Sequence, residues 1–272
     1  MTSIVSISSL KGGVGKTSVT LGLASAAQAC GLRVLVIDLD PHGDASTGLG
    51  SPTDGADMGA MLSAPDNYWL KDEIRPSSWT ALGSLGQASR TGLEAGVWVG
   101  RASARLTALE RSEPTDILLP HLARLLEPVS DDFDLILIDC PPTLGRLTEM
   151  AWAASGRVLS VAEPSLFSVA GSERTMRAIA RFESNTEYAV GAASIIMNKV
   201  RDNDPEHEYR TEEMRVLFGD LVAEIPIPET PLLQRIQGSA YPVHYWPEAE
   251  AQPLADAFTA LLAGLVELEK AK

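Results

Sequence analysis

The fold of this chain is decided by the stretch Ser9-Leu10-Lys11-Gly12-Gly13-Val14-Gly15-Lys16-Thr17-Ser18. An apolar run at 4–7 precedes it and a segment with an apolar helical face follows at 19–30, which predicts a strand, a glycine-rich turn and a helix. Glycines allow a tight bend that brings backbone N–H groups close to an anion, and the helix N-terminus adds further unpaired N–H groups. The sequence therefore predicts a loop that binds nucleotide phosphates rather than an ordinary turn.

Different residues of this loop suit different parts of a triphosphate. Lys16 is expected to place its ammonium group on the β- and γ-phosphates, and the Thr17 hydroxyl is expected to ligate Mg²⁺. Further contacts to the phosphates are expected from Gly12, Gly13, Val14, Gly15 and Ser18. The loop departs from the general G-x-x-x-x-G-K-[ST] pattern, because Leu10 occupies the position of the first glycine and Lys11 follows it.

With this departure, the segment from Lys11 to Ser18 resembles the deviant Walker A loop of the ParA/MinD family of ATPases. The resemblance implies that Lys11 reaches across an ATP-bound homodimer to the phosphates of the partner subunit, much as an arginine finger stabilises charge in phosphoryl transfer. It also implies that Lys11 and Lys16 both contact the nucleotide and act in catalysis. The alternative interpretation of Lys11 is a solvated loop lysine.

A second motif follows the apolar run at 34–37. Asp38 and Asp40 stand two residues apart, so an extended strand end points both carboxylates to one side. Beside a triphosphate, carboxylates hold Mg²⁺ through water or orient the attacking water. The segment resembles the switch I of the same family, which implies that Asp40 positions the water and that Asp38 lies near the metal. His42 and Asp44 replace the usual Gln and Asn, and Asp44 equally suits a helix cap.

A third motif is the apolar run at 135–138, which ends in Asp139 and continues into Pro141 and Pro142. An apolar strand that ends in aspartate is a Walker B arrangement, in which Asp139 meets Mg²⁺ through a water molecule. The paired prolines make the segment similar to the D-x-P-P switch II of the ParA/MinD family. They stiffen a turn whose position can report the γ-phosphate.

The C-terminal half carries two weaker matches to this family. Asn198 follows the apolar run at 193–197 and matches a position that contacts adenine, although a turn residue at a strand end is the alternative interpretation. The segment Pro226, Ile227 and Pro228 resembles a family segment whose backbone lines the base pocket. Residues 163–171 resemble the segment near the dimer face.

The order of apolar runs predicts the fold class. Strands are expected at 4–7, 34–37, 97–99, 135–138, 158–161, 193–197 and 221–225. Helices are expected at 19–30, 102–110, 114–127, 172–182, 208–218 and 251–269. This alternation predicts a doubly wound α/β fold with a mostly parallel sheet and helices on both faces, the P-loop NTPase fold of the deviant Walker A class. Residues 1–272 are interpreted as one domain, with a less regular region at 51–112.

The charge balance limits the binding partners. With 36 acidic and 22 basic residues the net charge is −14, which argues against a surface that attracts DNA broadly. The net charge does not exclude a local basic patch that binds DNA. The candidate residues for such a patch are Arg174, Arg177, Arg181, Arg201 and Arg235. The first three recur at helical spacing, so they share one face. The alternative is a set of solvated arginines balanced by neighbouring glutamates.

No apolar run reaches the length of a membrane span, and no signal peptide is found, so we expect a cytoplasmic protein without a membrane partner. Cys30 and Cys140 are far apart and lack metal-ligand spacing, which argues against an iron–sulfur role.

The resemblance predicts a function that combines these motifs. Binding of ATP and Mg²⁺ would drive formation of a homodimer, and slow hydrolysis to ADP would reset a cycle of DNA segregation or positioning. A ParB-like or other activating protein would stimulate hydrolysis, and nonspecific DNA binding would place the protein on the nucleoid. The alternative is an orphan positioning protein that moves a protein cargo or division component without strong DNA binding. A small-molecule amidoligase of the same superfamily is a third interpretation, which Lys11 fits poorly.

Overall fold

The computed structural model describes residues 2–83, 95–112 and 116–266, and its sheet has seven strands in the order β3-β4-β2-β5-β1-β6-β7. The strands are β1 (Ser3–Ser8), β2 (Arg33–Asp38), β3 (Arg75–Pro76), β4 (Gly96–Gly100), β5 (Leu135–Asp139), β6 (Arg157–Ala162) and β7 (Ala192–Met197). All neighbouring strands run parallel except β3, which pairs antiparallel with β4. The mostly parallel sheet that the sequence predicts is confirmed.

Helices cover both faces of this sheet, which is why the inner strands are apolar on both sides. On β2, Val34 and Val36 belong to one buried cluster, while Leu35 and Ile37 belong to the other. The first face is covered by α1 (Lys16–Ala29), α11 (Leu232–Gly238) and α12 (Gln252–Ala263). The second face is covered by α3 (Met58–Ser63), α6 (Leu106–Glu110), α7 (His121–Leu126), α8 (Arg146–Ala154), α9 (Leu166–Asn185) and α10 (Pro205–Phe218).

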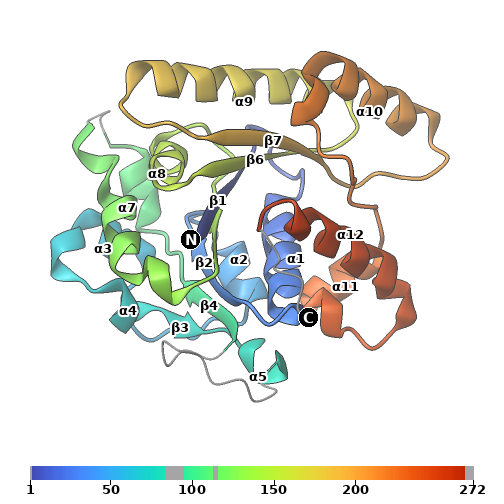
Figure 1. Cartoon of the computed structure of the whole chain (residues 1–272). Coiled ribbons are helices and arrows are strands. Elements are labelled where there is room, and N and C mark those ends of the chain that lie inside the picture. The colour runs from blue at the N-terminus through green and yellow to red at the C-terminus, as the bar shows by residue number, and fades with distance from the viewer. Residues whose placement is uncertain (1, 84–94, 113–115, 267–272) are drawn as a thin grey trace.

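Figure 1 shows this layering: α9 and α10 form one outer layer above β6 and β7, and α1, α11 and α12 lie on the other side. Shorter helices complete the chain, namely α2 (Asp44–Gly48), α4 (Leu70–Glu73) and α5 (Thr80–Gly83). The 3-10 turns are η1 (Pro65–Asn67), η2 (Asp116–Leu118), η3 (Glu127–Asp132), η4 (Gly219–Leu221), η5 (Val243–Tyr245) and η6 (Ala249–Ala251). Within the described part of the chain, every helix is too short or too polar to cross a bilayer.

The structure corrects four of the predicted elements. The predicted strand at 221–225 is wrong: η4 occupies its start, and only Val222 forms an isolated bridge, to Ile195. Gly219, with φ +55°, turns the chain just before this segment, and Pro226 lacks the N–H that a ladder needs. The predicted helix at 114–127 is divided into η2 and α7, since α7 begins only after Pro120. Residues 114–115 lie outside the described residues.

The third correction concerns the less regular region, where the predicted helix at 102–110 forms only from Leu106. The same region holds the edge strand β3, which the sequence reasoning missed because it has two residues and includes Pro76. The predicted strand at 97–99 is confirmed as β4. At the other end of the chain, the predicted helix at 251–269 begins as α12 and ends at Ala263, while residues 267–269 lie outside the described residues.

The parallel sheet places four loops at one edge. Strands β1, β2, β5 and β7 all run in the same direction, so the segments that follow them leave the sheet at their shared carboxyl ends. In open α/β sheets ligands bind at this edge. The three charged motifs and Asn198 all lie there, which brings together residues that are far apart in the sequence.

Candidate nucleotide-binding site

The glycine-rich loop between β1 and α1 adopts a conformation that only glycine tolerates well. Gly13 and Gly15 have φ of +78° and +92°, in the left-handed region. Gly15 is the N-cap of α1, and a Cβ atom there would lie 2.2 Å from the Nδ2 atom of Asn198. The loop therefore brings its backbone to the N-terminus of a 14-residue helix, where unpaired N–H groups and the helix dipole favour an anion.

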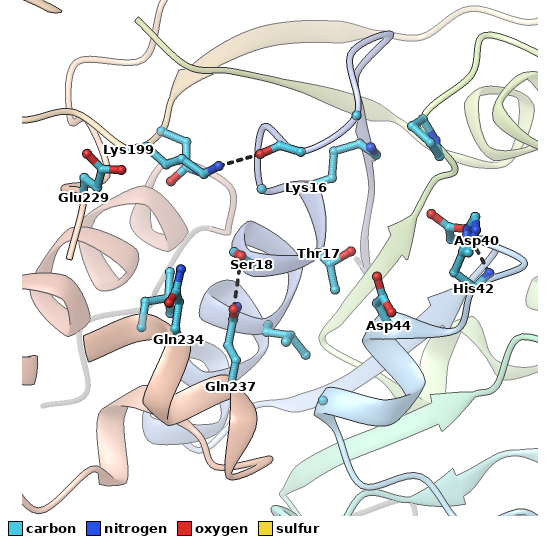
Figure 2. Close-up of a pocket in the computed structure, with 18 of the residues that line it drawn as sticks. Lys16, Thr17, Ser18, Asp40, His42, Asp44, Lys199, Glu229, Gln234 and Gln237 are labelled. Atoms are coloured by element: carbon cyan, nitrogen blue, oxygen red, sulfur yellow. Dashed lines mark hydrogen bonds and ion pairs between the residues drawn. The ribbon is translucent and has the colours of Figure 1, made fainter. Parts of the chain in front are cut away.

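A cavity of about 700 Å³ opens above this loop. Its lining joins the loop to the segments after β2, β5 and β7 and to α11, through Gly12, Gly13, Gly15, Lys16, Thr17, Ser18, Leu21, Asp40, His42, Asp44, Thr47, Gly48, Pro142, Asn198, Lys199, Pro228, Glu229, Thr230, Leu233, Gln234 and Gln237. Figure 2 shows Lys16 and Thr17 between two walls, with Asp40, His42 and Asp44 on one side and Lys199 and Glu229 on the other. The predicted phosphate loop and the predicted switch I residues thus face the same space.

The predicted metal ligands Thr17 and Asp139 are in direct contact. The Thr17 hydroxyl donates to Oδ2 of Asp139 at 2.8 Å, and the Thr20 hydroxyl donates to Oδ1 at 2.8 Å. Burial raises the pKa of Asp139 to about 6, while the two threonine hydroxyls and the charge of Lys16 oppose this rise. Sequence reasoning missed Thr20, although it lies three residues after Thr17 and therefore on the same side of the helix.

Asp38 is also buried, and it does not line the cavity. Its Oδ2 accepts from the backbone N–H of Ser46 at 2.8 Å and from the Ser46 hydroxyl at 2.7 Å. Its Oδ1 accepts from the backbone N–H of Asp40 at 3.1 Å. Burial, and then the charge of Asp139, raise the pKa of Asp38 to about 7. Asp38 was predicted to lie near the metal, and this stays a prediction; in the structure its contacts hold the segment at 40–46 in place.

Asp40 lines the cavity and carries a partner that the sequence did not predict. Its Oδ1 accepts from the backbone N–H of His42 at 3.0 Å and lies 2.8 Å from the His42 Nδ1 atom. The hydrogen bond to Asp40, followed by the charge of Asp40, raises the pKa of the exposed His42 side chain. Asp44 follows Gly43, the N-cap of α2, and no side chain caps that helix; Asp44 places its charge in the first turn instead.

The predicted base-binding residues separate into two groups. Asn198 and Pro228 line the cavity, and the Asn198 Nδ2 atom donates to the backbone carbonyl of Val14 at 2.7 Å. Ile227 is fully buried in the core, and neither Ile227 nor Pro226 belongs to the lining. Sequence reasoning missed that α11 contributes to the cavity. The amphipathic pattern of this helix is short, and the segment before it is rich in proline and carries no strand signal. Three of its residues, Leu233, Gln234 and Gln237, line the cavity, and Gln237 accepts from the Ser18 hydroxyl at 3.5 Å.

Lys11 in the loop and Lys199 beside it differ in whether they line the cavity. Lys11 does not line it, since its ammonium group forms an ion pair with Glu163 in the same subunit. Lys199 does line it, and its Nζ atom donates to the backbone carbonyl of Gly13 (Figure 2). The backbone of Lys199 is in the left-handed region at φ +58°, which is uncommon for a residue with a side chain. Sequence reasoning did not place Lys199 at this site.

The five predicted DNA-binding arginines do not form one free basic patch. Arg177 pairs with Glu173, Arg201 lies 3.0 Å from a Glu229 oxygen, and Arg235 lies 3.0 Å from a Glu248 oxygen. Arg174 and Arg181 are exposed on α9, and within the described residues neither forms an ion pair. Three of the five arginines therefore have acidic partners, and DNA binding by the five stays a prediction.

A family model and curated relatives both match most of the chain. The model of the family AAA_31, described as an AAA domain, matches residues 2–190. The Bacillus subtilis sporulation initiation inhibitor protein Soj is 27% identical over 245 residues, which cover 89% of this chain and 90% of that protein. The Caulobacter vibrioides chromosome partitioning protein ParA is 28% identical over 228 residues, covering 83% of this chain and 80% of that protein.

Solved structures agree on the fold. An ATP complex of a Cyanothece McdA variant superimposes with a TM-score of 0.81 at 18% identity, and the match covers 99% of each chain. Cobyrinic acid a,c-diamide synthase from Mycobacterium smegmatis with bound ADP and magnesium gives a TM-score of 0.74 at 20% identity, covering 97% of this chain and 94% of that one.

Proposed function

The chain belongs to the AAA-domain family AAA_31 and is a ParA-like member of the P-loop NTPases, and from this premise we propose that it is an ATPase whose ATP-bound form is a homodimer. The observation that carries the proposal is the cavity that the phosphate loop, Thr17 and Asp40 line together, with the buried Asp139 hydrogen-bonded to the Thr17 hydroxyl. Slow hydrolysis of ATP to ADP would return the dimer to monomers.

The donor atoms present fit a magnesium nucleotide. Mg²⁺ prefers oxygen ligands and usually takes one or two from protein and others from phosphate and water. The Thr17 hydroxyl and the Asp139 carboxylate are oxygen donors held 2.8 Å apart, and the left-handed Gly13 and Gly15 leave the loop backbone open to phosphate. When bound, the metal would neutralise charge on the phosphates.

The protein side chains then have distinct roles in hydrolysis. Lys16, which is nearly buried at the start of α1, would stabilise the negative charge that develops on the phosphates. Asp40 would orient the attacking water with its carboxylate. The backbone of Asp40 is held in place because its N–H donates to the Asp38 carboxylate. Lys11 would add its charge from the partner subunit, so the hydrolytic site would be complete only in the dimer.

The proposed cellular role is DNA segregation or positioning, with an activating protein partner that stimulates hydrolysis. It is supported by the Soj and ParA relatives, whose names describe sporulation control and chromosome partitioning. Arg174 and Arg181 on α9 are the arginines best placed to contact DNA phosphates. The net charge of −14 favours the alternative, a positioning ATPase that acts on a protein cargo with weak DNA binding.

A small-molecule amidoligase is the second candidate. It is supported by the fold that the chain shares with cobyrinic acid a,c-diamide synthase. The two candidates differ in what they require of Lys11. A dimerising ATPase needs this lysine at the partner's phosphates, whereas an amidoligase reaction needs no lysine from a second subunit.

The test measures ATP turnover and ATP-dependent self-association for the wild type, Lys11→Ala and Asp40→Ala. We expect Asp40→Ala to lower turnover about 100-fold, since a group that handles the proton of the nucleophile contributes at least this much, while dimers persist. Lys11→Ala should lose both dimers and turnover. Full turnover in Lys11→Ala, with no ATP-dependent dimer of the wild type, would contradict the proposal and favour the amidoligase.

A further inference from the structure

Glu163 lies between Lys11, which belongs to the phosphate loop, and Lys199, which contacts this loop. Glu163 forms an ion pair with Lys11 through Oε1, and its Oε2 lies 3.9 Å from the Nζ atom of Lys199. Lys199 in turn donates to the backbone carbonyl of Gly13. Two positive charges beside the loop are therefore balanced by one carboxylate of the same subunit.

The backbone fixes Glu163 in this position. It follows β6 directly, and the backbone N–H of Ser165 donates to the Glu163 carbonyl at 2.8 Å. Ser165 is also the N-cap of α9, because its hydroxyl accepts from the backbone N–H of Ser168 at 3.3 Å. A strand end and a capped 20-residue helix thus hold the carboxylate beside the loop, with 25% of the Glu163 side chain exposed.

We propose that Glu163 is a releasable counter-ion that retains Lys11 in its own subunit and so opposes ATP-dependent dimerisation. The inference rests on the proposed function, because Lys11 has to leave Glu163 before it can reach a partner's phosphates. ATP supplies competing negative charge for both lysines, Lys11 and Lys199. Lys199 contacts both Glu163 and the loop. When phosphates occupy the loop, they attract both lysines, and this weakens the Lys11–Glu163 ion pair.

This arrangement sets the threshold for dimer formation. Two Lys11–Glu163 ion pairs have to open for each dimer, one in each subunit. Because each pair is partly exposed, opening it costs a modest amount, about threefold in equilibrium constant. Together the two pairs shift the dimerisation equilibrium by roughly tenfold.

Glu163→Gln tests the proposal, because glutamine keeps the size and removes the charge. In sedimentation velocity with ATP and Mg²⁺, we expect the dimer of the variant to form at a protein concentration roughly tenfold lower than in the wild type. Glu173→Gln is the matched control: it also removes a glutamate from an ion pair, here with Arg177 on the exposed face of α9, and should leave the concentration unchanged. A higher concentration required by Glu163→Gln would overturn the proposal, since Glu163 would then stabilise the dimer.

A second readout does not depend on dimerisation. In nucleotide-free monomers, release of Lys11 should raise its rate of acetylation by a small amine-reactive reagent several-fold in Glu163→Gln, measured by mass spectrometry against Lys71 as reference. Lys71 lies on α4 and pairs with Asp132 at 2.8 Å. Faster acetylation with no dimer in either protein would support the restraint on Lys11 and reject the dimeric ATPase. Unchanged acetylation would reject the restraint itself.

Discussion

The register of β2 and β5 pairs Asp38 with Asp139, so two fully buried carboxylates lie side by side at the end of the sheet. They have separate partners: Asp38 holds the switch I loop through Ser46 and the Asp40 N–H, and Asp139 holds the hydroxyls of Thr17 and Thr20. Burial raises both pKa values, to about 7 and about 6. The nucleotide-free protein therefore carries an ionisation cost that a bound cation would offset.

Asp139→Asn should stabilise the nucleotide-free protein at pH 8, and this gain should shrink as pH falls toward 4. An acid whose folded-state pKa is raised binds more protons when folded, so the free energy of unfolding falls as pH rises from about 4 to about 7. Asparagine removes that loss, and the hydroxyls of Thr17 and Thr20 can both donate to and accept from its amide. At pH 8 we expect a gain on the order of 2 kcal/mol, or about 5 °C in Tm by calorimetry.

Addition of ATP and Mg²⁺ is the control for this prediction. The wild type should gain thermal stability from the magnesium nucleotide, because binding to the folded state alone stabilises it. The variant should gain much less, since it lacks the carboxylate beside Thr17. A variant less stable than the wild type at pH 8 without nucleotide would show that Asp139 is stabilised as a charge and that its pKa is not raised.

His42→Gln should flatten the pH dependence of ATP turnover. The pKa of His42 is raised by Asp40, so the imidazolium engages the Asp40 carboxylate up to a pH above the ordinary value near 6.5. As pH rises through this raised value the charge is lost, and Asp40 becomes available to orient water. We expect turnover of the wild type to rise between pH 6.5 and pH 8.5 more steeply than that of the variant.

The ratio of the two turnover rates is the quantity to measure in steady state at saturating ATP. Ionisation of Asp38 and Asp139 affects both proteins alike, so it cancels in the ratio. A ratio that stays constant from pH 6.5 to pH 8.5 would mean that the charge of His42 has no influence on Asp40.

Asn198→Ala should weaken ATP binding by about tenfold. The side chain is buried, and its loss leaves the carbonyl of Val14 without its donor at 2.7 Å, a cost of about 1–3 kcal/mol. Titration with fluorescent ATP and GTP separates two roles of the residue. If Asn198 positions the loop, both affinities fall together, whereas a residue that recognises adenine would change the ratio of ATP to GTP affinity.

The sequence predicted structure and site correctly where one short segment contains all the residues on which the prediction depends. The loop at 9–18 predicted both the tight glycine-rich turn and the helix after it, and the aspartates at the ends of β2 and β5 identified the edge of the sheet. Glu163 and Lys199 could not be predicted in their roles, because their contacts join segments more than 150 residues apart in the chain to the loop. The false strand at 221–225 has a different origin: of its large apolar residues only Val222 is buried, while Leu221 and Ile225 are exposed, and the segment forms one isolated bridge and no ladder.

DNA binding, if it uses α9, should depend on Arg174 and Arg181 and much less on Arg177. All three arginines are exposed on the same helix, but among the described residues only Arg177 has an acidic ion-pair partner, Glu173. Each arginine that neutralises a phosphate contributes about 0.9 to the slope of log affinity against log salt. With ATP present, the double variant Arg174→Ala and Arg181→Ala should therefore lose affinity for duplex DNA and lower this slope by about 2.

Arg177→Ala is the matched control on the same helix and should keep most of the affinity and the slope. Filter binding or fluorescence anisotropy at several salt concentrations measures both quantities. An equal loss in all three single variants would mean that the Arg177–Glu173 ion pair opens on DNA, because exposed ion pairs are worth little. No DNA binding by the wild type at low salt would reject the segregation role, and the acidic net charge would then favour a protein cargo.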